Sequence, residues 1–300
     1  MASTPSEPLR VGYVPEHFST PLHLAQLHKY YASTTVTFHP FPSGTGHMIQ
    51  SLKSHEIDVA VGLTEGWVAG IKGSAKASWY KVIGQYVASP LCWAISAGAN
   101  RDTTVESLEG NGKVGISRIG SGSYIMSFVL AKQNGWIFRS AEGKKEPFEF
   151  VVLDNFKRLR DAVNSGDADA FMWEHFTSKK FYDSGEIKRI GEIYTPWPSW
   201  LITADTGLVE SKDPRLIDFL DGLNKGIAHF KANHDEGITW ITSNLEYSEE
   251  DAKEWRKGVR FVDDVKQVDL AMVENVIDIL KDAGVVDRSE NTDGVVVTID

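Results

Sequence analysis

Cysteine is almost missing from this sequence, since Cys92 is the only one among 300 residues. A lone thiol excludes an internal disulfide and a zinc cluster built on cysteines, and it is typical of a reducing compartment. The sequence also lacks any uninterrupted run of roughly 18 apolar residues, the length that a membrane-spanning helix needs. Its opening, MASTPSEPLR, has no basic segment followed by an apolar run, as a secretory signal would. We therefore expect a cytoplasmic protein without a membrane span, and a trimmed signal peptide is the alternative.

Basic residues are also scarce, because 31 Lys and Arg stand against 41 Asp and Glu and give a formal net charge of −10. Nucleic acids and anionic membranes bind surfaces on which Lys and Arg are concentrated, so neither is an expected partner. With 42% hydrophobic residues, the chain is long enough for two globular domains of ordinary size. We expect its partner to be a small-molecule ligand, and its oligomeric state is left open.

The usual nucleotide-binding glycine motifs are missing, although one glycine-serine turn stands out. In LEGNGKVGISRIGSGSYIMSFVLAKQNGW, residues 113–117 predict a strand and residues 120–123 a turn. Apolar residues then recur at the spacing of an amphipathic helix, at Ile125, Met126, Val129 and Leu130. The turn has no Walker lysine, Ile125 replaces the third small residue of a dinucleotide fingerprint, and no G-x-S-x-G elbow is present. We therefore expect no cofactor.

The start of this helix is itself a candidate binding element. Ser121 or Ser123 is placed to cap it, and its first backbone N–H groups would face a surface turn. Gly120 and Gly122 allow close approach, which favours an anionic or strongly accepting ligand group. A capped helix without any ligand is the alternative.

Periodic segments predict strands that alternate with helices. Strands are expected at residues 9–14, 36–41, 113–117, 149–153, 168–173 and 187–193, with helices at residues 21–31, 156–163 and from 214 onward. This alternation predicts an α/β protein with parallel strand pairing and helices on both faces of each sheet. The stripe from Leu216 to Phe230 predicts a helix that packs on the first lobe. The ending, NTDGVVVTID, resembles a strand whose neighbour the sequence does not identify.

Two stretches of the chain resemble each other. SGTGHMIQSL followed by IDVAVGLTEGW, and the later DAVNSGDADAFMWEHF, both read as helix, turn and strand. Asp58 and Asp169 precede the two strands, where a structural role in the turn is expected, and Glu65 and Glu174 follow them. We predict two similar lobes with a hinge at residues 89–99 and 193–202. Residues 1–95 with 195–300 would form lobe 1, and residues 96–194 would form lobe 2.

A two-lobed α/β chain that crosses its hinge twice resembles the type II periplasmic-binding-protein fold. The motifs RVGYVPEHFSTPLHLA, PSGTGHMI, IDVAVGLTEGW, SRIGSGS, DAFMWEHF and TPWPSW resemble one branch of it over about residues 9–283. That branch contains the bacterial sulfonate, taurine and thiamine-pyrimidine binders and the fungal hydroxymethylpyrimidine synthases, and the GSGS and TPWPSW motifs resemble an intracellular subgroup. This sequence departs from the synthases in lacking their cysteine-rich segment, and from the bacterial receptors in lacking an export signal.

The resemblance implies a ligand held between the lobes, at strand ends and helix starts. Glu65 and Glu174 would accept hydrogen bonds and the glycine-serine turns would donate them, which suits an amino-substituted heterocycle or a small zwitterion. Several of the nine tryptophans lie at predicted strand ends, where they would sandwich a flat ring, with core packing as the alternative. The candidate ligand-binding residues are Glu16, His17, Ser43, Thr45, His47, Thr64, Glu65, Trp67, Ser89, Pro90, Arg118, Gly120, Ser121, Gly122, Ser123, Trp173, Glu174 and Trp197.

The leading hypothesis is a non-catalytic solute-binding protein that closes two lobes around a thiamine-pyrimidine-like or sulfonate-like ligand. No catalytic residues are assigned. No metal is expected, because His17, His47 and His175 lack the i, i+4 pairing of helical metal ligands. One alternative is an enzyme of thiamine biosynthesis related to the synthases, which would use a histidine and pyridoxal phosphate. Another is an interaction module that adds its C-terminal tail to a partner's sheet.

Overall fold

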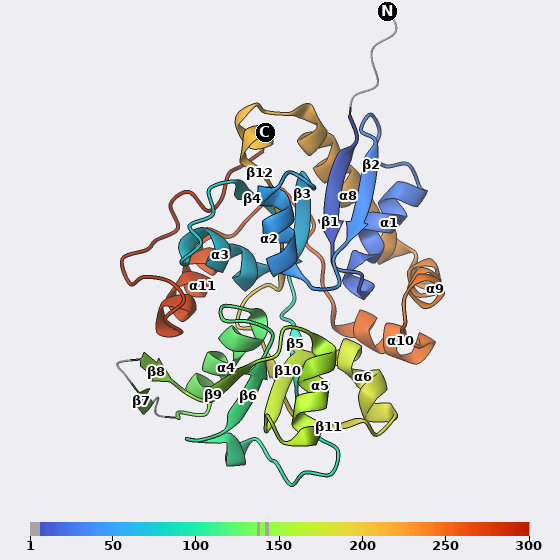
Figure 1. The fold of residues 1–300 in the computed structure, drawn as a ribbon. Coiled ribbons are helices and arrows are strands. Elements are labelled where there is room, and N and C mark those ends of the chain that lie inside the picture. Colours follow the sequence, from blue (N-terminus) through green and yellow to red (C-terminus); the bar gives the residue numbers. More distant parts are fainter. Residues whose placement is uncertain (1–6, 137–138, 142–143, 300) are drawn as a thin grey trace, which may run out of the picture. The chain divides into compact units, whose positions relative to one another are not determined.

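Two five-stranded sheets organise the protein, one in each of two compact units (Figure 1). The computed structural model describes residues 7–136, 139–141 and 144–299. Among these, unit 1 takes in the chain up to Ser89, Ser199–Glu274 and the chain from Asn291, whereas unit 2 takes in Pro90–Pro198 and Asn275–Glu290. Helices and strands alternate in both, which confirms the predicted α/β class. The lobe boundaries at residues 95 and 195 stay a prediction.

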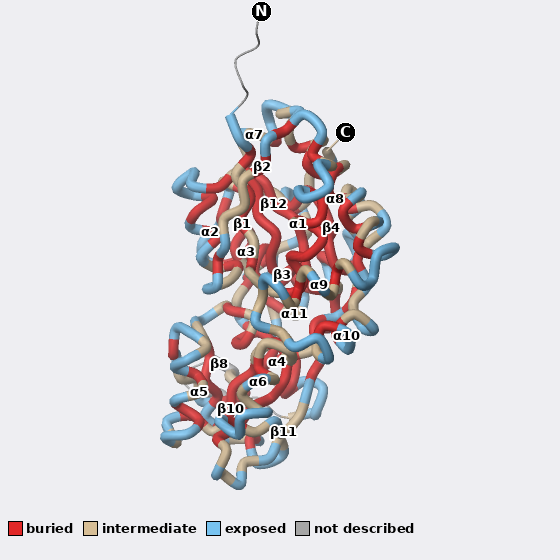
Figure 2. Tube along the Cα trace, turned by 90° about the vertical axis from the view of Figure 1, so that its right-hand side faces the viewer, coloured by how far each residue is buried: buried red, intermediate tan, exposed pale blue. Residues whose placement is uncertain are grey.

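The sheet of unit 1 has the strand order β2-β1-β3-β12-β4. Its strands are β1 (Leu9–Tyr13), β2 (Val36–Pro40), β3 (Val59–Leu63), β4 (Tyr80–Val87) and β12 (Trp200–Asp205). β1 is parallel to β2 and β3, whereas β12 lies antiparallel between β3 and β4. β3, β4 and β12 are buried along most of their length (Figure 2), as expected for strands that helices cover on both faces.

Helices cover both faces of this sheet. α2 (Thr45–Lys53) and α3 (Thr64–Lys72) pack on one face, where a side chain at Gly12 would meet Met48 of α2. Tyr13 points to the opposite face and contacts His23 of α1 (Thr20–Leu27). α8 (Pro214–Ala232) packs on α1, because Gly226 leaves room for the Pro21 carbonyl group. The packing on the first lobe that was expected for the helix containing Leu216 to Phe230 is therefore confirmed.

The remaining helices of the C-terminal half are shorter. They are α7 (Thr206–Glu210), α9 (His234–Asn244), α10 (Glu249–Gly258) and α11 (Leu270–Asp282). α9 contacts α1 and α8, and α10 contacts α9. From Asn275 onward, the residues of α11 are grouped with unit 2.

The C-terminal tail finds its neighbour in β4. Val82 donates its backbone N–H to the Val295 carbonyl at 2.9 Å and accepts from the Val297 N–H at 2.9 Å. Lys81 Nζ adds a hydrogen bond to the Gly294 carbonyl at 2.7 Å. The tail thus adds to the edge of a sheet in its own chain, so the alternative in which it pairs with another protein loses its basis for these residues.

The sheet of unit 2 has the strand order β11-β5-β10-β6-β9. Its strands are β5 (Cys92–Gly98), β6 (Lys113–Ile116), β9 (Glu149–Val152), β10 (Ala170–Glu174) and β11 (Ile187–Tyr194). β7 (Arg139–Ala141) and β8 (Lys144–Glu146) form a separate antiparallel pair. α5 (Phe156–Ser165) and α6 (His175–Asp183) pack on one face around Phe171, and α4 (Gly122–Gln133) packs on β6 and β10.

The predicted similarity of the two lobes is confirmed by their topology. In unit 2, β6 pairs in parallel with β9 and β10, as β1 does with β2 and β3 in unit 1. β5 lies antiparallel between β10 and β11, as β12 does between β3 and β4. β12 returns to its sheet after the chain has formed unit 2, whereas β5 belongs to the same continuous segment as the other strands of its sheet.

Asp58 and Asp169 make the same contacts at corresponding places in the two units. The Asp58 carboxylate accepts hydrogen bonds from the Arg10 backbone N–H at 2.8 Å and from its guanidinium group at 2.6 Å. Asp169 accepts from the Lys113 backbone N–H at 2.9 Å and from the Arg101 guanidinium group at 2.7 Å. Each carboxylate ties the start of its strand to the start of the neighbouring strand, which confirms the structural role predicted for both.

Replacing either aspartate with alanine should lower the free energy of unfolding by about 1.5–3 kcal/mol, because a charge-assisted hydrogen bond to a strand N–H is lost. Asp161→Ala is the control, since that carboxylate pairs with Lys157 on the exposed surface of α5, and a loss within about 0.5 kcal/mol is expected. Denaturant unfolding measures all three. Similar small losses in the three variants would contradict a structural role for Asp58 and Asp169.

Two expectations about local structure were wrong, those of parallel pairing throughout and of an amphipathic helix after the glycine-serine turn. The pairing is not all parallel, because β5 and β12 are antiparallel to their neighbours. The chain passes between the units after Ser89 and after Pro198, inside the two predicted hinge segments, which also contain β5, the end of β11 and the start of β12. The helix after the glycine-serine turn is not amphipathic, since α4 is buried continuously from Ser123 to Ala131.

Candidate functional site

The predicted site residues of unit 1 gather where β1, β3 and β4 end and β12 begins. Trp200, at the start of β12, lies opposite Leu63 and Val87 at the ends of β3 and β4. The Thr64 backbone N–H donates to the Ser199 carbonyl at 3.0 Å, and the Ser199 hydroxyl donates to the Ser89 carbonyl at 2.8 Å. Thr64 and Ser89 are thus brought together at one edge of the sheet.

His17 sits in an aromatic pocket of unit 1. It follows β1 in a short 3-10 turn (η1, His17–Ser19), after the half-buried Glu16, and is fully buried. Its ring stacks on Tyr247 with centroids 4.5 Å apart and lies 4.3 Å from the centroid of Trp255 in α10. The sequence reasoning missed Tyr247 and Trp255, because nothing local connects them to a residue more than 200 positions earlier.

Thr45 and Glu65 complete the buried polar residues at this edge. The Thr45 hydroxyl, at the start of α2, accepts the Leu63 backbone N–H at 2.9 Å. Glu65 lies in the first turn of α3 and is fully buried, where a negative charge is favoured by the helix dipole. Ser43 and His47 flank the start of α2 and are exposed.

Trp67 belongs to the core of unit 1. It is fully buried and meets Tyr80 edge-on at 5.3 Å, and the Tyr80 hydroxyl donates to its carbonyl at 2.8 Å. Its surroundings match the core-packing alternative weighed for the tryptophans. Contact between Trp67 and a ligand stays a prediction.

The glycine-serine turn of unit 2 uses both of its hydroxyls internally. Ser121 accepts the Tyr124 backbone N–H at 3.3 Å, and Ser123 accepts the Ser117 N–H at 3.2 Å. The expected surface turn is instead largely buried, since both serines are 2% exposed and lie 2.9 Å apart through their hydroxyls. Gly120, with φ of +76°, provides the left-handed bend before them, and Gly122 is half-buried. The cap is confirmed, and ligand contact stays a prediction.

Glu174 is the carboxylate whose surroundings change its chemistry most clearly. It ends β10, lies opposite Trp93 of β5, and accepts the Thr177 backbone N–H at 2.6 Å. Burial raises the pKa of Glu174 to about 7, and the hydrogen bond from Thr177 only partly offsets this effect. The neighbouring Trp173 is half-buried and stacks on Phe156, with ring centroids 4.9 Å apart.

The other predicted residues of unit 2 differ in exposure. Trp197 is buried, and its carbonyl accepts the Thr195 hydroxyl at 2.8 Å. The same hydroxyl accepts the Leu91 N–H at 2.9 Å, which fixes the loops beside β5 and β11. Pro90 and Arg118 are exposed. Taken unit by unit, buried hydroxyls, a buried carboxylate and tryptophan rings therefore lie at each sheet edge.

Cys92 is not placed for nucleophilic chemistry. Burial raises the pKa of its thiol to about 12, so it is protonated at neutral pH. The reactive form of cysteine is the thiolate, so a covalent role for this residue is disfavoured.

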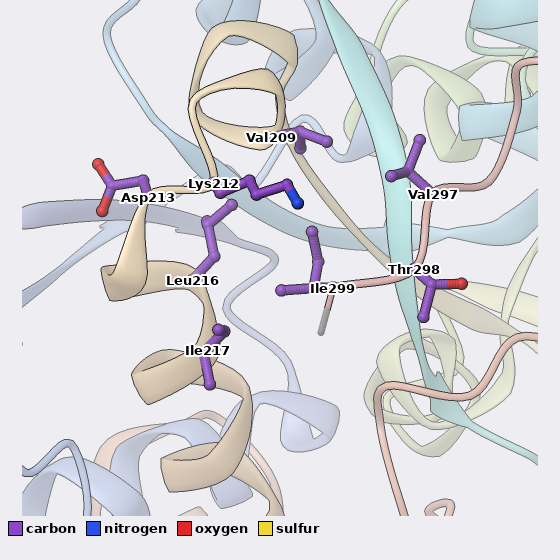
Figure 3. Close-up of a pocket in the computed structure, with 8 residues that line it drawn as sticks. All are labelled: Val209, Lys212, Asp213, Leu216, Ile217, Val297, Thr298 and Ile299. Carbon is purple, nitrogen blue, oxygen red and sulfur yellow. The ribbon is translucent and has the colours of Figure 1, made fainter.

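A small cavity of unit 1 lies away from all of these residues. It measures about 120 Å³ and lies where α7 and α8 meet the C-terminal tail (Figure 3). Ligand pockets commonly measure about 300–1,000 Å³, so this cavity is too small for a heterocyclic ligand. Its lining residues are Val209, Lys212, Asp213, Leu216, Ile217, Val297, Thr298 and Ile299.

Among the described residues, no helix combines the length and the apolarity that crossing a membrane requires.

The fold of the two units defines the class to which the protein belongs: it is the periplasmic-binding-protein fold. The alkanesulfonate-binding protein SsuA from Xanthomonas axonopodis pv. citri, solved bound to MOPS, matches with a TM-score of 0.77 at 14% identity, over 98% of this chain and 99% of that one. The periplasmic aliphatic sulphonate binding protein SsuA from Escherichia coli matches with a TM-score of 0.72 at 16% identity, over 98% and 93%. At such low identity, these matches show the fold alone.

Within this class the chain belongs to the Ca3427-like family. It is 43% identical to the Candida albicans CA3427 gene product over 98% of this chain and 97% of that one, with a TM-score of 0.88. Residues 93–193 also match the family profile described as Ca3427-like PBP. None of the curated proteins compared with the chain matches it. The resemblance expected from the sequence motifs is therefore confirmed.

Proposed function

We propose that the protein is a solute-binding protein that closes two lobes around a small polar ligand. In this proposal lobe 1 is residues 1–95 with 195–300, and lobe 2 is residues 96–194. One observation carries the proposal: in each unit a buried carboxylate, Glu65 or Glu174, lies at the carboxyl edge of the sheet among hydroxyls and tryptophans. Open α/β sheets bind ligands at that edge, because the parallel strands end and the helices begin there.

The chemistry of these edges favours a ligand with both donor and acceptor groups. The neutral amino group of an aminopyrimidine, or the ammonium group of a zwitterion, would donate to the ionised Glu174 carboxylate, and an accepting ring nitrogen or sulfonate would face N–H groups at the helix starts. Tryptophan rings add affinity for a flat ring, by about 0.5–1.5 kcal/mol for each good pair. The ligand we propose is a thiamine-pyrimidine-like heterocycle, with a sulfonate zwitterion such as taurine as the second choice.

Native mass spectrometry of freshly purified protein, followed by calorimetry with a 4-aminopyrimidine and with taurine, tests this proposal. A bound small molecule that is released chemically unchanged is the expected result. An enzyme related to the synthases would instead return an altered ligand, lose mass from a histidine, or show the absorbance of a pyridoxal adduct. Any of these three results would replace the binding function with catalysis.

Replacing Gly122 with valine should weaken binding of the better of these two probes at least tenfold, or by about 1.4 kcal/mol. A branched side chain at the first position of α4 would block close approach to the N–H groups of the turn, whereas β-branching lowers helix propensity only slightly. Gly258→Val at the end of α10, where a Cβ meets nothing within 4 Å, is the matched control. Equal affinity in both folded variants would leave the turn with its capping role only.

A further inference from the structure

Three side chains that commonly ligate metals meet on the helices of unit 1. His28 follows α1, His229 lies in the last turn of α8, and Glu236 lies in the first turn of α9. His28 Nε2 is 2.8 Å from Glu236 Oε1, and His229 Nε2 is 2.6 Å from Oε2. One ligand atom from each of the three lies within 4.8 Å of the others, and no other group of three in the described chain does so.

The surrounding structure holds these side chains in place. The two imidazole rings lie with their centroids 4.0 Å apart, and the Tyr30 hydroxyl is 2.9 Å from Nδ1 of His229. A hydrogen bond to the second ring nitrogen is what orients a metal-ligating histidine and leaves its Nε2 directed at the ion. The backbone is fixed as well, since the His229 carbonyl accepts the Asn233 N–H at 2.8 Å and α1, α8 and α9 contact one another.

Two imidazole nitrogens and a carboxylate oxygen form a ligand set that suits Zn²⁺ and its neighbours in the first transition series. The side chains of His28, His229 and Glu236 are 33%, 15% and 35% exposed, so an ion can enter and water can take the fourth position. From this geometry we propose that His28, His229 and Glu236 bind one divalent transition-metal ion, foremost Zn²⁺, which braces α1 against α8 and α9. The competing arrangement is a cluster in which both rings hydrogen-bond to the carboxylate without an ion.

The test uses the whole chain, freed of metal with a chelator and then dialysed. Zn²⁺ is titrated in competition with a chromogenic chelator, and Co²⁺ is added separately to record its visible absorption. We expect one ion per chain at this site, a rise in the unfolding temperature on adding Zn²⁺, and a Co²⁺ spectrum with nitrogen ligation. His28→Gln, His229→Gln and Glu236→Gln should each weaken Zn²⁺ binding at least tenfold while the circular dichroism spectrum is unchanged.

His55→Gln is the matched control, because His55 also faces a carboxylate, Asp205 at 3.3 Å, but belongs to no group of three candidate metal ligands in the described part of the chain. This variant should bind Zn²⁺ as the native protein does. Tyr30→Phe, which removes only the group that orients His229, should weaken binding by about tenfold. The proposal is overturned if the native protein binds no stoichiometric Zn²⁺, or if His229→Gln and His55→Gln bind it equally well.

Discussion

Glu174→Gln should make the protein progressively more stable, relative to the native chain, as the pH rises from 4.5 to 8, by roughly 3 kcal/mol in total. In the folded protein burial raises the pKa of Glu174 from 4.5 to about 7. Between these values the unfolded chain releases its proton while the folded chain keeps it, so native stability falls with rising pH. The stability that protonated Glu174 contributes to the native protein is fully present below pH 4.5 and is lost as the pH passes 7. Glutamine does not titrate, so the variant has no such dependence.

Denaturant unfolding of both proteins at several pH values gives this difference directly, because the contributions of all other groups cancel. Glu109→Gln, at an exposed turn position outside the helices and strands, is the control for replacing a glutamate as such, and its stability should differ little from that of the native protein. A difference between Glu174→Gln and the native chain that stays flat across this range would mean that the folded protein holds Glu174 ionised throughout.

The same variant bears on the proposed function. If an amine-bearing ligand pairs with the Glu174 carboxylate, glutamine should weaken it by about 1.5–3 kcal/mol through loss of a charge-assisted hydrogen bond. Native affinity should increase as the pH rises through 7, because the carboxylate must ionise to make that pair. Stability and affinity thus report separately on the burial of Glu174 and on its contact with ligand.

Elements with strong periodicity could be predicted from the sequence, because each depends on local pattern. The strand expected at residues 187–193 is β11 (Ile187–Tyr194), and the helix expected at residues 156–163 is α5 (Phe156–Ser165). β5 and β12 were missed because they follow Pro90 and the proline-rich TPWPSW, and so read as connections. Their antiparallel pairing joins distant parts of the chain, which local periodicity does not report.

The candidate site could be predicted only where topology alone determines it. Parallel strands end at one edge, so Thr64 and Ser89 were expected together and are linked through Ser199. Buried hydroxyls at Ser121 and Ser123 were not expected, because helix capping patterns carry no information about what packs above the turn. The histidines of the proposed metal site are 201 positions apart, so no motif spacing reveals them.

Trp255→Ala should cost about 3–5 kcal/mol of the free energy of unfolding, the largest loss we expect from any single substitution considered. Trp255 is 4% exposed and fills the space between His17, Phe18 and Phe230, with ring centroids 4.3, 5.3 and 6.0 Å away. Truncation leaves a cavity that surrounding aromatic rings cannot fill without leaving their rotamers. Trp255→Phe keeps most of the contact area and should lose distinctly less.

Trp240→Ala is a matched control within the same unit, because Trp240 stacks on His23 at 4.5 Å and 16° but is only half-buried. Trp240→Ala should lose less of the free energy of unfolding than Trp255→Ala, because truncating a half-buried ring returns less apolar surface to water. Denaturant unfolding ranks the three variants, and calorimetry with the probe that binds the native protein then separates packing from function. If His17 contacts the ligand, Trp255→Phe should weaken the probe and Trp240→Ala should not, because Trp255 packs on the His17 ring and Trp240 packs on His23 instead. Equal affinity in these two variants would confine His17 to the core of unit 1.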